Sequence, residues 1–373
     1  MEFIDLKAQY LTLKEEIDTN IERVLKSTHF ILGEEEKEFE EHLAEYVGVK
    51  YAIGCSDGTA ALQLIYMAYG IGKGDAVFCP DITFIASIEP ACLLGATPIF
   101  CDIDKNTYNL DTKSLERQIK AVLKEGKYIP KAIVAVDFLG NPADYDNIKK
   151  IANKYNLLLI EDAAQAMGAS LNGIKCGAFG DIAATSFFPA KPLGCYGDGG
   201  AIFTNDDKIR EILCSLRVHG KGESKYDNIR IGINSRLDTI QAAILLPKLK
   251  VLDKEIQARQ NIAKRYNEAF ADKLQIPYIQ GGAISSYAQY ALLAHDKKQR
   301  EYIMEELKRN EVPSMIYYPN PLHTMKVFEG CFKGEEKFES SIAYAEKTFS
   351  LPFSPYLLKS DQERIIDIIK HCF

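Results

Sequence analysis

The chain has 373 residues, 47% of them hydrophobic and 26% charged, which is typical of a soluble globular protein with about two domains. Its 45 Lys and Arg against 52 Asp and Glu give a net charge of −7, so we expect no nucleic-acid partner. The first residues lack a signal-peptide pattern, and apolar runs such as 242–246 are too short to cross a bilayer, so we expect a cytoplasmic protein without membrane contact.

The cysteines and histidines give no metal-binding pattern. The nine cysteines include no C-x-x-C pair, and the six histidines form no H-E-x-x-H motif. Several cysteines lie in apolar runs, as Cys79 does. We therefore expect buried, reduced thiols and no metal site.

Short apolar runs alternate with helix-period segments over the first 205 residues. The runs predict strands at 76–79, 98–102, 132–137, 157–161, 183–187 and 201–204. The periodic segments predict helices at 35–47, 60–69 and 145–155. This alternation indicates an α/β fold with a mostly parallel sheet.

The pattern changes near Leu249, where a long helix can connect two domains. After it we expect a strand at 287–293, a helix at 300–309 and a strand at 315–318. A last helix is expected to start at the capping box Ser360-x-x-Glu363. The sequence thus predicts a large α/β domain over 1–248, with an N-terminal helical segment, and a smaller α+β domain over 249–373.

Two ionisable residues follow predicted strands, at the edge where parallel α/β sheets bind ligands. Asp162 follows the apolar run 157–160 and Glu161, although such a carboxylate can also cap a helix or form a salt bridge. Lys191 lies between Pro189 and Pro192 beyond another apolar run. A partly desolvated lysine loses proton affinity and becomes a nucleophile, although a surface loop would also accommodate it.

Small and aromatic residues near other strand ends suit a flat, phosphorylated ligand. Gly58 and Thr59 open a predicted helix, whose free N–H groups can bind phosphate, and Ser186 could add a hydroxyl. Phe84 follows a strand and could stack on a ring. A plain capped helix and a core phenylalanine are the alternative interpretations.

Taken together, these residues describe a site for pyridoxal 5'-phosphate (PLP). Asp162 would keep the pyridine nitrogen protonated, and Lys191 would hold the aldehyde as a Schiff base. The glycines between 194 and 200 neither follow a strand nor open a helix with G-x-G-x-x-G spacing, so a dinucleotide-binding loop is rejected.

Several tracts, in order along nearly the whole chain, resemble the DegT-type sugar-nucleotide aminotransferases. They are Gly58-Thr59-x-Ala61-Leu62, residues 161–165, 186–194 and 197–201, Arg217-Val218-His219-Gly220, residues 234–238 and Tyr318-Pro319-x-Pro321-Leu322-His323. The resemblance implies the type I PLP-dependent aminotransferase fold, with a mostly parallel seven-stranded sheet. It also implies a homodimer with active sites at the subunit interface.

The resemblance further assigns roles to individual residues. Lys191 and Asp162 would be catalytic, and Gln165 would lie near the ring hydroxyl. Gly58, Thr59 and Ser186 would contact the phosphate, with Asn234 reaching in from the partner subunit. Lysine at 191 sets this chain apart from the family's dehydratases, which carry histidine there.

Within the family, the chain looks closest to enzymes that aminate UDP-linked keto-N-acetylhexosamines, including a 3-keto uronic acid. In the uronate subgroup a histidine precedes the Tyr-Pro, whereas this sequence has Tyr317 before Tyr318, which leaves a 4-keto-6-deoxy sugar open. Arg236, Tyr317, Tyr318 and His323 are expected to bind substrate, and Arg236 could instead be structural or bind the donor.

The resemblance implies transfer of an amino group from L-glutamate to a keto-sugar nucleotide, in the synthesis of bacterial surface glycans such as O-antigen lipopolysaccharide. Two alternative functions stay open. One is a dTDP-keto-6-deoxyhexose aminotransferase. The other is a non-catalytic regulatory or sugar-nucleotide-binding protein with the same fold.

Overall fold

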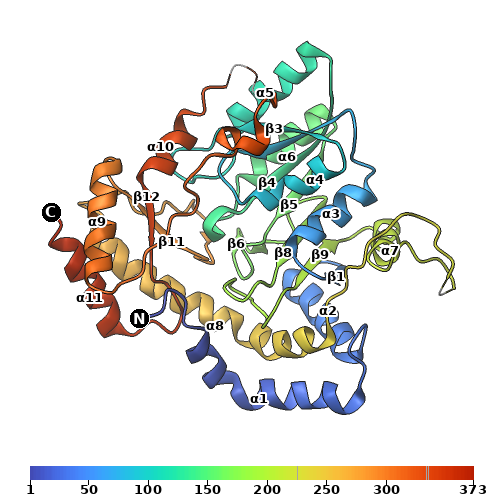
Figure 1. Ribbon diagram of the computed structural model, residues 1–373, viewed down its shortest axis with the longest axis horizontal. Coiled ribbons are helices and arrows are strands. Elements are labelled where there is room, and N and C mark those ends of the chain that lie inside the picture. The colour runs from blue at the N-terminus through green and yellow to red at the C-terminus, as the bar shows by residue number, and fades with distance from the viewer. Residues whose placement is uncertain (225, 333, 335) are drawn as a thin grey trace.

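The computed structural model describes residues 1–224, 226–332, 334 and 336–373, and a seven-stranded sheet lies at the centre of this part (Figure 1). The strand order is β1-β9-β8-β5-β4-β2-β3, and β9 alone runs antiparallel to its neighbours. The predicted mostly parallel sheet is confirmed. Its strands are Tyr51–Cys55 (β1), Asp75–Pro80 (β2), Thr97–Cys101 (β3), Ile129–Val136 (β4), Leu158–Asp162 (β5), Ile182–Ser186 (β8) and Gly200–Thr204 (β9).

Helices cover both faces of this sheet. The α-helices of the described residues are Leu6–Ser27 (α1), Glu34–Val47 (α2), Gly58–Ala68 (α3), Glu89–Leu93 (α4), Thr112–Glu125 (α5), Tyr145–Tyr155 (α6), Asp207–Leu216 (α7), Thr239–Phe270 (α8), Lys297–Arg309 (α9), Glu339–Lys347 (α10) and Lys359–Lys370 (α11), and those of the N-terminal part pack on the sheet.

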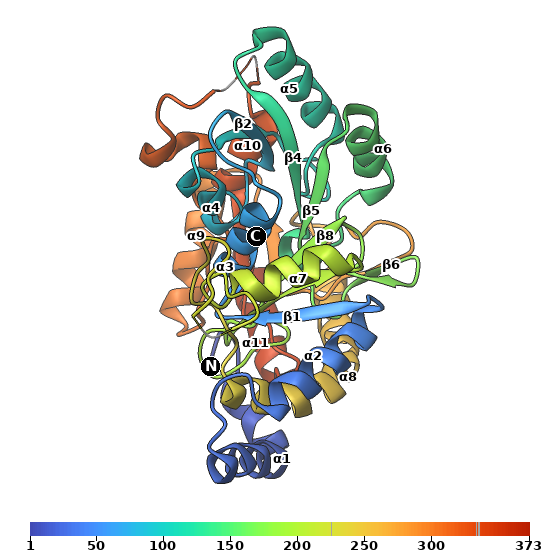
Figure 2. The ribbon, with the colours of Figure 1, turned by 90° about the vertical axis from the view of Figure 1, so that its right-hand side faces the viewer.

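Alternating side chains of the strands build a core on each face of the sheet. Val77 and Val134 pack with α3 and α7, while their neighbours Phe78 and Ile133 pack with α5 and α6. This alternation is the two-residue period of a strand that is buried on both sides. Figure 2 shows α2 and α8 side by side beneath β1, with α1 outermost and packed on α8.

A second core lies in the C-terminal part of the chain. It combines the end of α8 with α9, α11 and a two-stranded antiparallel sheet of Tyr290–Leu293 (β11) and Thr348–Leu351 (β12). These elements gather to one side of the large sheet in Figure 1. Helix α8 runs through the predicted boundary at residue 249, so the division at that position stays a prediction.

Two expectations for this C-terminal part are wrong. Residues 315–318 form no strand, because Met315 makes a single bridge to Ser350 and the prolines at 313 and 319 interrupt any ladder. The last helix begins at Lys359 after Leu358, with no side-chain cap, so Ser360 lies inside the first turn instead of capping it.

Short elements complete the fold. A small sheet joins Ala283–Ile284 (β10) to Ser170–Leu171 (β6) and Ile174–Lys175 (β7). Within the described residues, no helix has the length and apolar character that crossing a membrane requires.

Candidate active site

A cavity of about 520 Å³ opens at the carboxyl ends of the central strands. It brings together most of the residues predicted for the site, which are Gly58, Thr59, Phe84, Asp162, Ser186, Lys191, Tyr317 and Tyr318. Phe84 is 54% exposed although it is a large aromatic residue, so its ring is a free surface of the cavity wall. Ser87, Asp198, Gln289 and Ile4 also line the cavity and were not predicted.

Asp162 is the last residue of β5 and is almost completely buried. Its carboxylate accepts hydrogen bonds from Ser87 Oγ at 2.6 Å and from the Ala164 N–H at 3.1 Å. Burial raises the pKa of Asp162, while these hydrogen bonds and the charge of Lys191 oppose the shift. Ser87 lies in a short helical turn, Ile85–Ser87 (η1), far from Asp162 in sequence, so no local pattern could have indicated its role.

Lys191 lies in the loop between β8 and β9, directly beyond the strand that pairs with β5. The loop is fixed by a hydrogen bond from the Lys191 N–H to the Phe188 carbonyl at 2.8 Å. Burial lowers the pKa of the Lys191 amine, and the negative charge of Asp162 opposes that shift. A lysine in this environment spends more time as a neutral amine, the form that is nucleophilic.

The start of α3 is the part of the cavity where a phosphate can be expected to bind. Asp57 caps the helix by accepting the Ala60 N–H at 2.8 Å, and the first N–H groups of a helix otherwise have no partner within it. A Cβ at Gly58 would lie 2.7 Å from Ser186 Cβ, and one at Gly200 would lie 2.5 Å from the Asp57 backbone. Glycine at both positions therefore allows the helix start and two strands to approach closely.

These features fit PLP. The start of α3 can take its phosphate, the exposed face of Phe84 can lie against a ring, and the buried Asp162 carboxylate calls for a cationic partner. Lys191 supplies an amine in the same cavity.

Two predicted residues lie just outside the cavity lining. Gln165 donates from Nε2 to the Tyr318 hydroxyl at 3.3 Å and accepts the Leu139 N–H at 2.6 Å, so it holds a lining residue in place. His323 Nδ1 lies 2.6 Å from Asp81 Oδ2, and its ring stacks on Phe338. The structure thus places His323 where it anchors the segment after Tyr318 to the end of β2.

Asn234, predicted to reach in from a partner subunit, and Arg236, predicted to bind substrate, do not line this chain's cavity. Asn234 is exposed and forms a bridge to Val218. Arg236 is partly buried, two residues further along the same segment.

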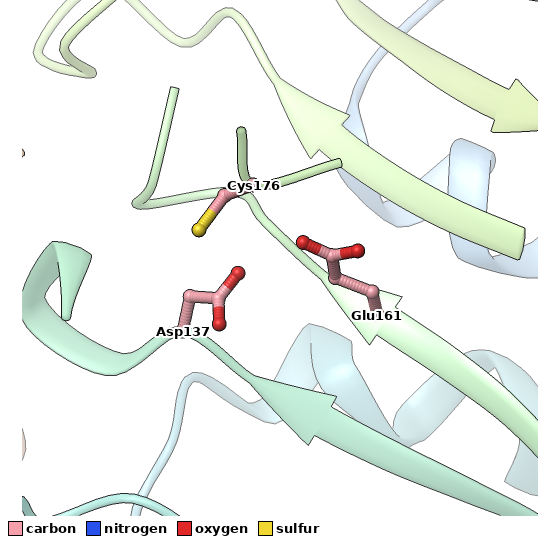
Figure 3. Close-up of side chains that lie close together, drawn as sticks. All are labelled: Asp137, Glu161 and Cys176. Atoms are coloured by element: carbon pink, nitrogen blue, oxygen red, sulfur yellow. The ribbon is translucent and has the colours of Figure 1, made fainter. Parts of the chain in front are cut away.

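Among the described residues, Asp137, Glu161 and Cys176 form a buried group whose side chains point toward one another (Figure 3). The oxygens of Glu161 accept backbone N–H groups of Gly177, Phe179 and Gly180. One oxygen of Asp137 accepts two hydrogen bonds, and the other has no partner. Because N–H groups already surround Glu161, a proton between the carboxyls suits this group better than a metal ion.

A buried lysine and a buried strand-end carboxylate in one cavity, beside a helix start that can take a phosphate, are the arrangement expected of a PLP-dependent enzyme of fold type I. The chain belongs to the DegT/DnrJ/EryC1/StrS aminotransferase family, whose sequence profile matches residues 11–370. Membership confirms the predicted family and, since its members depend on PLP, the predicted cofactor.

Similar proteins extend over nearly the whole chain. A UDP-2-acetamido-2-deoxy-3-oxo-D-glucuronate aminotransferase of Pseudomonas aeruginosa is 44% identical, covering 96% of both chains. A pleiotropic regulatory protein of Geobacillus stearothermophilus is 38% identical over 98% of this chain and 96% of its own. A dTDP-3-amino-3,6-dideoxy-alpha-D-galactopyranose transaminase of Aneurinibacillus thermoaerophilus is 40% identical over 98% of both.

Solved structures agree with this fold. An aminotransferase of the same family from Brucella abortus superposes with a TM-score of 0.97 at 46% identity, covering 100% of this chain and 99% of its own. NtdA of Bacillus subtilis, with bound cofactor PMP, reaches a TM-score of 0.87 at 27% identity, covering 96% of this chain and 81% of its own.

Proposed function

We propose that this sugar-nucleotide aminotransferase moves the amino group of L-glutamate to a UDP-linked 3-keto or 4-keto N-acetylhexosamine. The observation that carries the chemistry is the placement of Lys191 and Asp162 in one cavity with the start of α3. The 44% identity to an enzyme named for a UDP-linked 3-oxo sugar supports the substrate class.

PLP, when bound, supplies an electron sink for the carbon next to the transferred amino group. Asp162 would hold a proton at the pyridine nitrogen. Its buried carboxylate can be ionised there because the positive charge of the protonated nitrogen compensates the negative charge. The neutral amine of Lys191 would hold the cofactor and, with the donor bound, would move the proton from the donor α-carbon to the carbon of PLP next to the transferred amino group. The keto sugar is aminated by the reverse sequence of proton movements, with Lys191 again as the base.

The remaining lining residues hold and orient the ligands. The N–H groups at Gly58 and Thr59, together with the Ser186 hydroxyl, hold the phosphate. Phe84 packs on one ring face. Tyr317 and Tyr318 border the side where the two substrates enter in turn.

The charge of the cavity supports a site shared between two copies of the chain. Its acidic and basic lining residues are Asp57, Asp162, Asp198 and Lys191, so acidic groups outnumber basic ones. Phosphate, the carboxylates of L-glutamate and a sugar diphosphate are all anions, which bind best to arginine or lysine. We therefore propose a homodimer in which Asn234 and Arg236 complete the partner's site.

Exposed apolar side chains lie beside the segment that would enter the partner. Phe30, Ile31 and Leu32 are 42%, 45% and 48% exposed, and Ile31 bridges to Asp238. Large apolar residues clustered at the surface are characteristic of an interface. This patch gives the homodimer a contact next to Arg236.

Two other functions, a dTDP-keto-6-deoxyhexose aminotransferase and a regulatory protein, are supported to different degrees. A dTDP-keto-6-deoxyhexose is favoured by the 40% identical transaminase and by Tyr317, which gives the cavity no positive charge for a sugar carboxylate. A regulatory protein would not need Lys191 and Asp162 in one cavity.

We further place the enzyme in the cytoplasm, in the synthesis of bacterial surface glycans such as O-antigen, because nucleotide-linked amino sugars are precursors for glycan assembly.

A turnover assay tests this substrate assignment. Protein loaded with PLP is incubated with L-glutamate and each of a panel of 3-keto and 4-keto sugars linked to UDP or dTDP, and 2-oxoglutarate is measured. We expect release with a UDP-linked keto-N-acetylhexosamine. Release with dTDP-linked 6-deoxy sugars alone would favour the second candidate, and none with any sugar would contradict the proposal.

A further inference from the structure

Gln289 is a polar residue in the cavity wall to which the mechanism assigns no part. It precedes β11, is 7% exposed, and lines the cavity together with Lys191 and Tyr318. Glutamine is seldom buried this deeply unless its amide is hydrogen-bonded.

The side-chain oxygen of Gln289 lacks such a partner. Its Oε1 is buried and, within the part of the chain that the structure describes, accepts no hydrogen bond. An unsatisfied buried acceptor carries a substantial cost in free energy, so a missing partner is the simplest explanation. Because the residue lines the substrate cavity, a rotation of its amide toward a bound ligand would supply that partner.

The backbone around Gln289 is held firmly. The Ala288 N–H donates to the Leu139 carbonyl at 3.1 Å, and the Ser286 N–H donates to the Gly140 carbonyl at 2.9 Å. Ser286 Oγ also donates to the Gln165 carbonyl at 2.7 Å. These contacts tie the segment to the same residues that hold Tyr318, so the amide is presented from a fixed position.

We propose that Gln289 is a specificity-determining residue that binds an uncharged hydrogen-bonding substituent of the keto sugar, a hydroxyl or an acetamido group. The inference rests on the proposed function and adds a residue to its substrate site. A carboxamide offers both a donor and an acceptor, which matches a hydroxyl or an amide. The carboxylates of L-glutamate are bound better by cations, so the amide discriminates in the sugar half of the reaction.

A structural water is the competing occupant. A second, much smaller cavity, large enough for about one water molecule, lies between Gln289 and Asn141, whose Oδ1 is also unpartnered. A water there would satisfy both amides without any role in substrate binding. The experiment must therefore separate a loss of stability from a loss of sugar recognition.

The test compares Gln289→Leu with Gln362→Leu as a matched control. Gln362 is also buried with an unpartnered Oε1, but it lies on α11 and does not line the cavity. The two half-reactions are followed separately in the PLP-loaded proteins by single-turnover absorbance, first with L-glutamate and then with a UDP-linked keto-N-acetylhexosamine.

We expect Gln289→Leu to lower kcat/KM for the keto sugar about tenfold to hundredfold while the glutamate half-reaction stays within about twofold. Gln362→Leu should leave both half-reactions unchanged. Gln289→Asn, which keeps the amide on a shorter side chain, should recover part of the loss and serves if the leucine variant does not fold.

Equal slowing of both half-reactions, or reduced stability with unchanged sugar kinetics, would overturn the inference in favour of a structural water. Failure of the proposed function would appear differently. In that case the unaltered protein would itself show no half-reaction with L-glutamate or with the sugar.

Discussion

At the scale of single residues, the chemistry depends on two buried side chains, Asp162 and Lys191, whose pKa values are shifted in opposite directions. Burial raises the pKa of Asp162 and lowers the pKa of Lys191, so each disfavours its own charged form. A bound pyridine ring that carries a proton restores the charge of Asp162 as an ion pair. Lys191 remains free to act as an amine.

Replacing Asp162 by asparagine keeps the shape but removes the charge that holds the proton on the ring. We expect Asp162→Asn to lower kcat by about 10²–10⁴-fold, because the electron sink weakens. Steady-state turnover with L-glutamate and the keto sugar measures the effect, and the absorbance of bound PLP shows whether the cofactor is retained. Turnover within about threefold of the original in a fully loaded variant would contradict this role.

Some residues of the cavity could be predicted from the sequence and others could not. Asp162 and Lys191 could be predicted because each follows an apolar strand, and strand ends meet at one edge of a parallel sheet. Ser87 and Gln289 could not, because a serine in a short turn and a glutamine before a strand carry no local signal. Only the three-dimensional fold brings them to the cavity.

At the scale of elements, the proposed phosphate site depends on the close approach of α3 to β8. A Cβ at Gly58 would lie 2.7 Å from Ser186 Cβ, so Gly58→Ala must push the helix start away from the strand. We expect PLP affinity to fall by about tenfold or more, since about 1.4 kcal/mol suffices for that change. Equilibrium titration with PLP checks this.

Gly281→Ala is the matched control for that substitution. A Cβ at Gly281 meets nothing within 4 Å, so the PLP affinity of this variant should stay unchanged. Equal affinities for both variants would mean that the start of α3 does not hold the phosphate.

The ends of β4 and β5 meet at the buried pair of Asp137 and Glu161 (Figure 3). Burial, and next the charge of Glu161, raises the pKa of Asp137 well above its usual range. Because the pKa of Asp137 is higher in the folded state, the protonated side chain contributes fully to the free energy of unfolding below the unfolded pKa of about 4. This contribution is lost as pH rises toward the folded pKa.

We therefore expect the free energy of unfolding to fall as pH rises above about 4, and Asp137→Asn to reduce this slope, because an amide needs no proton to face Glu161. Urea unfolding at pH 5 and pH 9 measures the slopes, with Asp146→Asn as an exposed control on α6. An unchanged slope would contradict the shared proton, and marked stabilisation by added divalent metal would indicate a metal site instead.

Elements were predicted best where the hydrophobic period was unambiguous. The helix over 145–155 matches α6 residue for residue, because its apolar positions recur at helical spacing. The expected strand over 315–318 does not exist, since flanking prolines outweigh its β-branched and aromatic composition. The prolines at 313 and 319 are visible in the sequence, so this strand could have been rejected from the local pattern.

At the scale of the whole molecule, the site is predicted to need two copies of the chain. Lys191→Ala and Arg236→Ala should each be inactive alone. If Arg236 acts in the partner's site, each mixed dimer contains one intact site, and an equimolar mixture should regain about a quarter of the original activity. Turnover after co-refolding of the two variants measures this.

No activity in mixtures that demonstrably contain mixed dimers would contradict the shared site. Co-refolding two preparations of the same variant is the control, because no intact site can then form. Size-exclusion chromatography with light scattering establishes the oligomeric state in each case.

The most direct measurement of the central claim is the visible absorption spectrum of the protein with PLP, before and after L-glutamate is added. We expect an absorption band of PLP bound to Lys191 that is absent from Lys191→Ala. Adding the donor should replace this band by the absorbance of the pyridoxamine form. A band that persists unchanged with L-glutamate, or that forms equally well without Lys191, would contradict aminotransferase activity at this site.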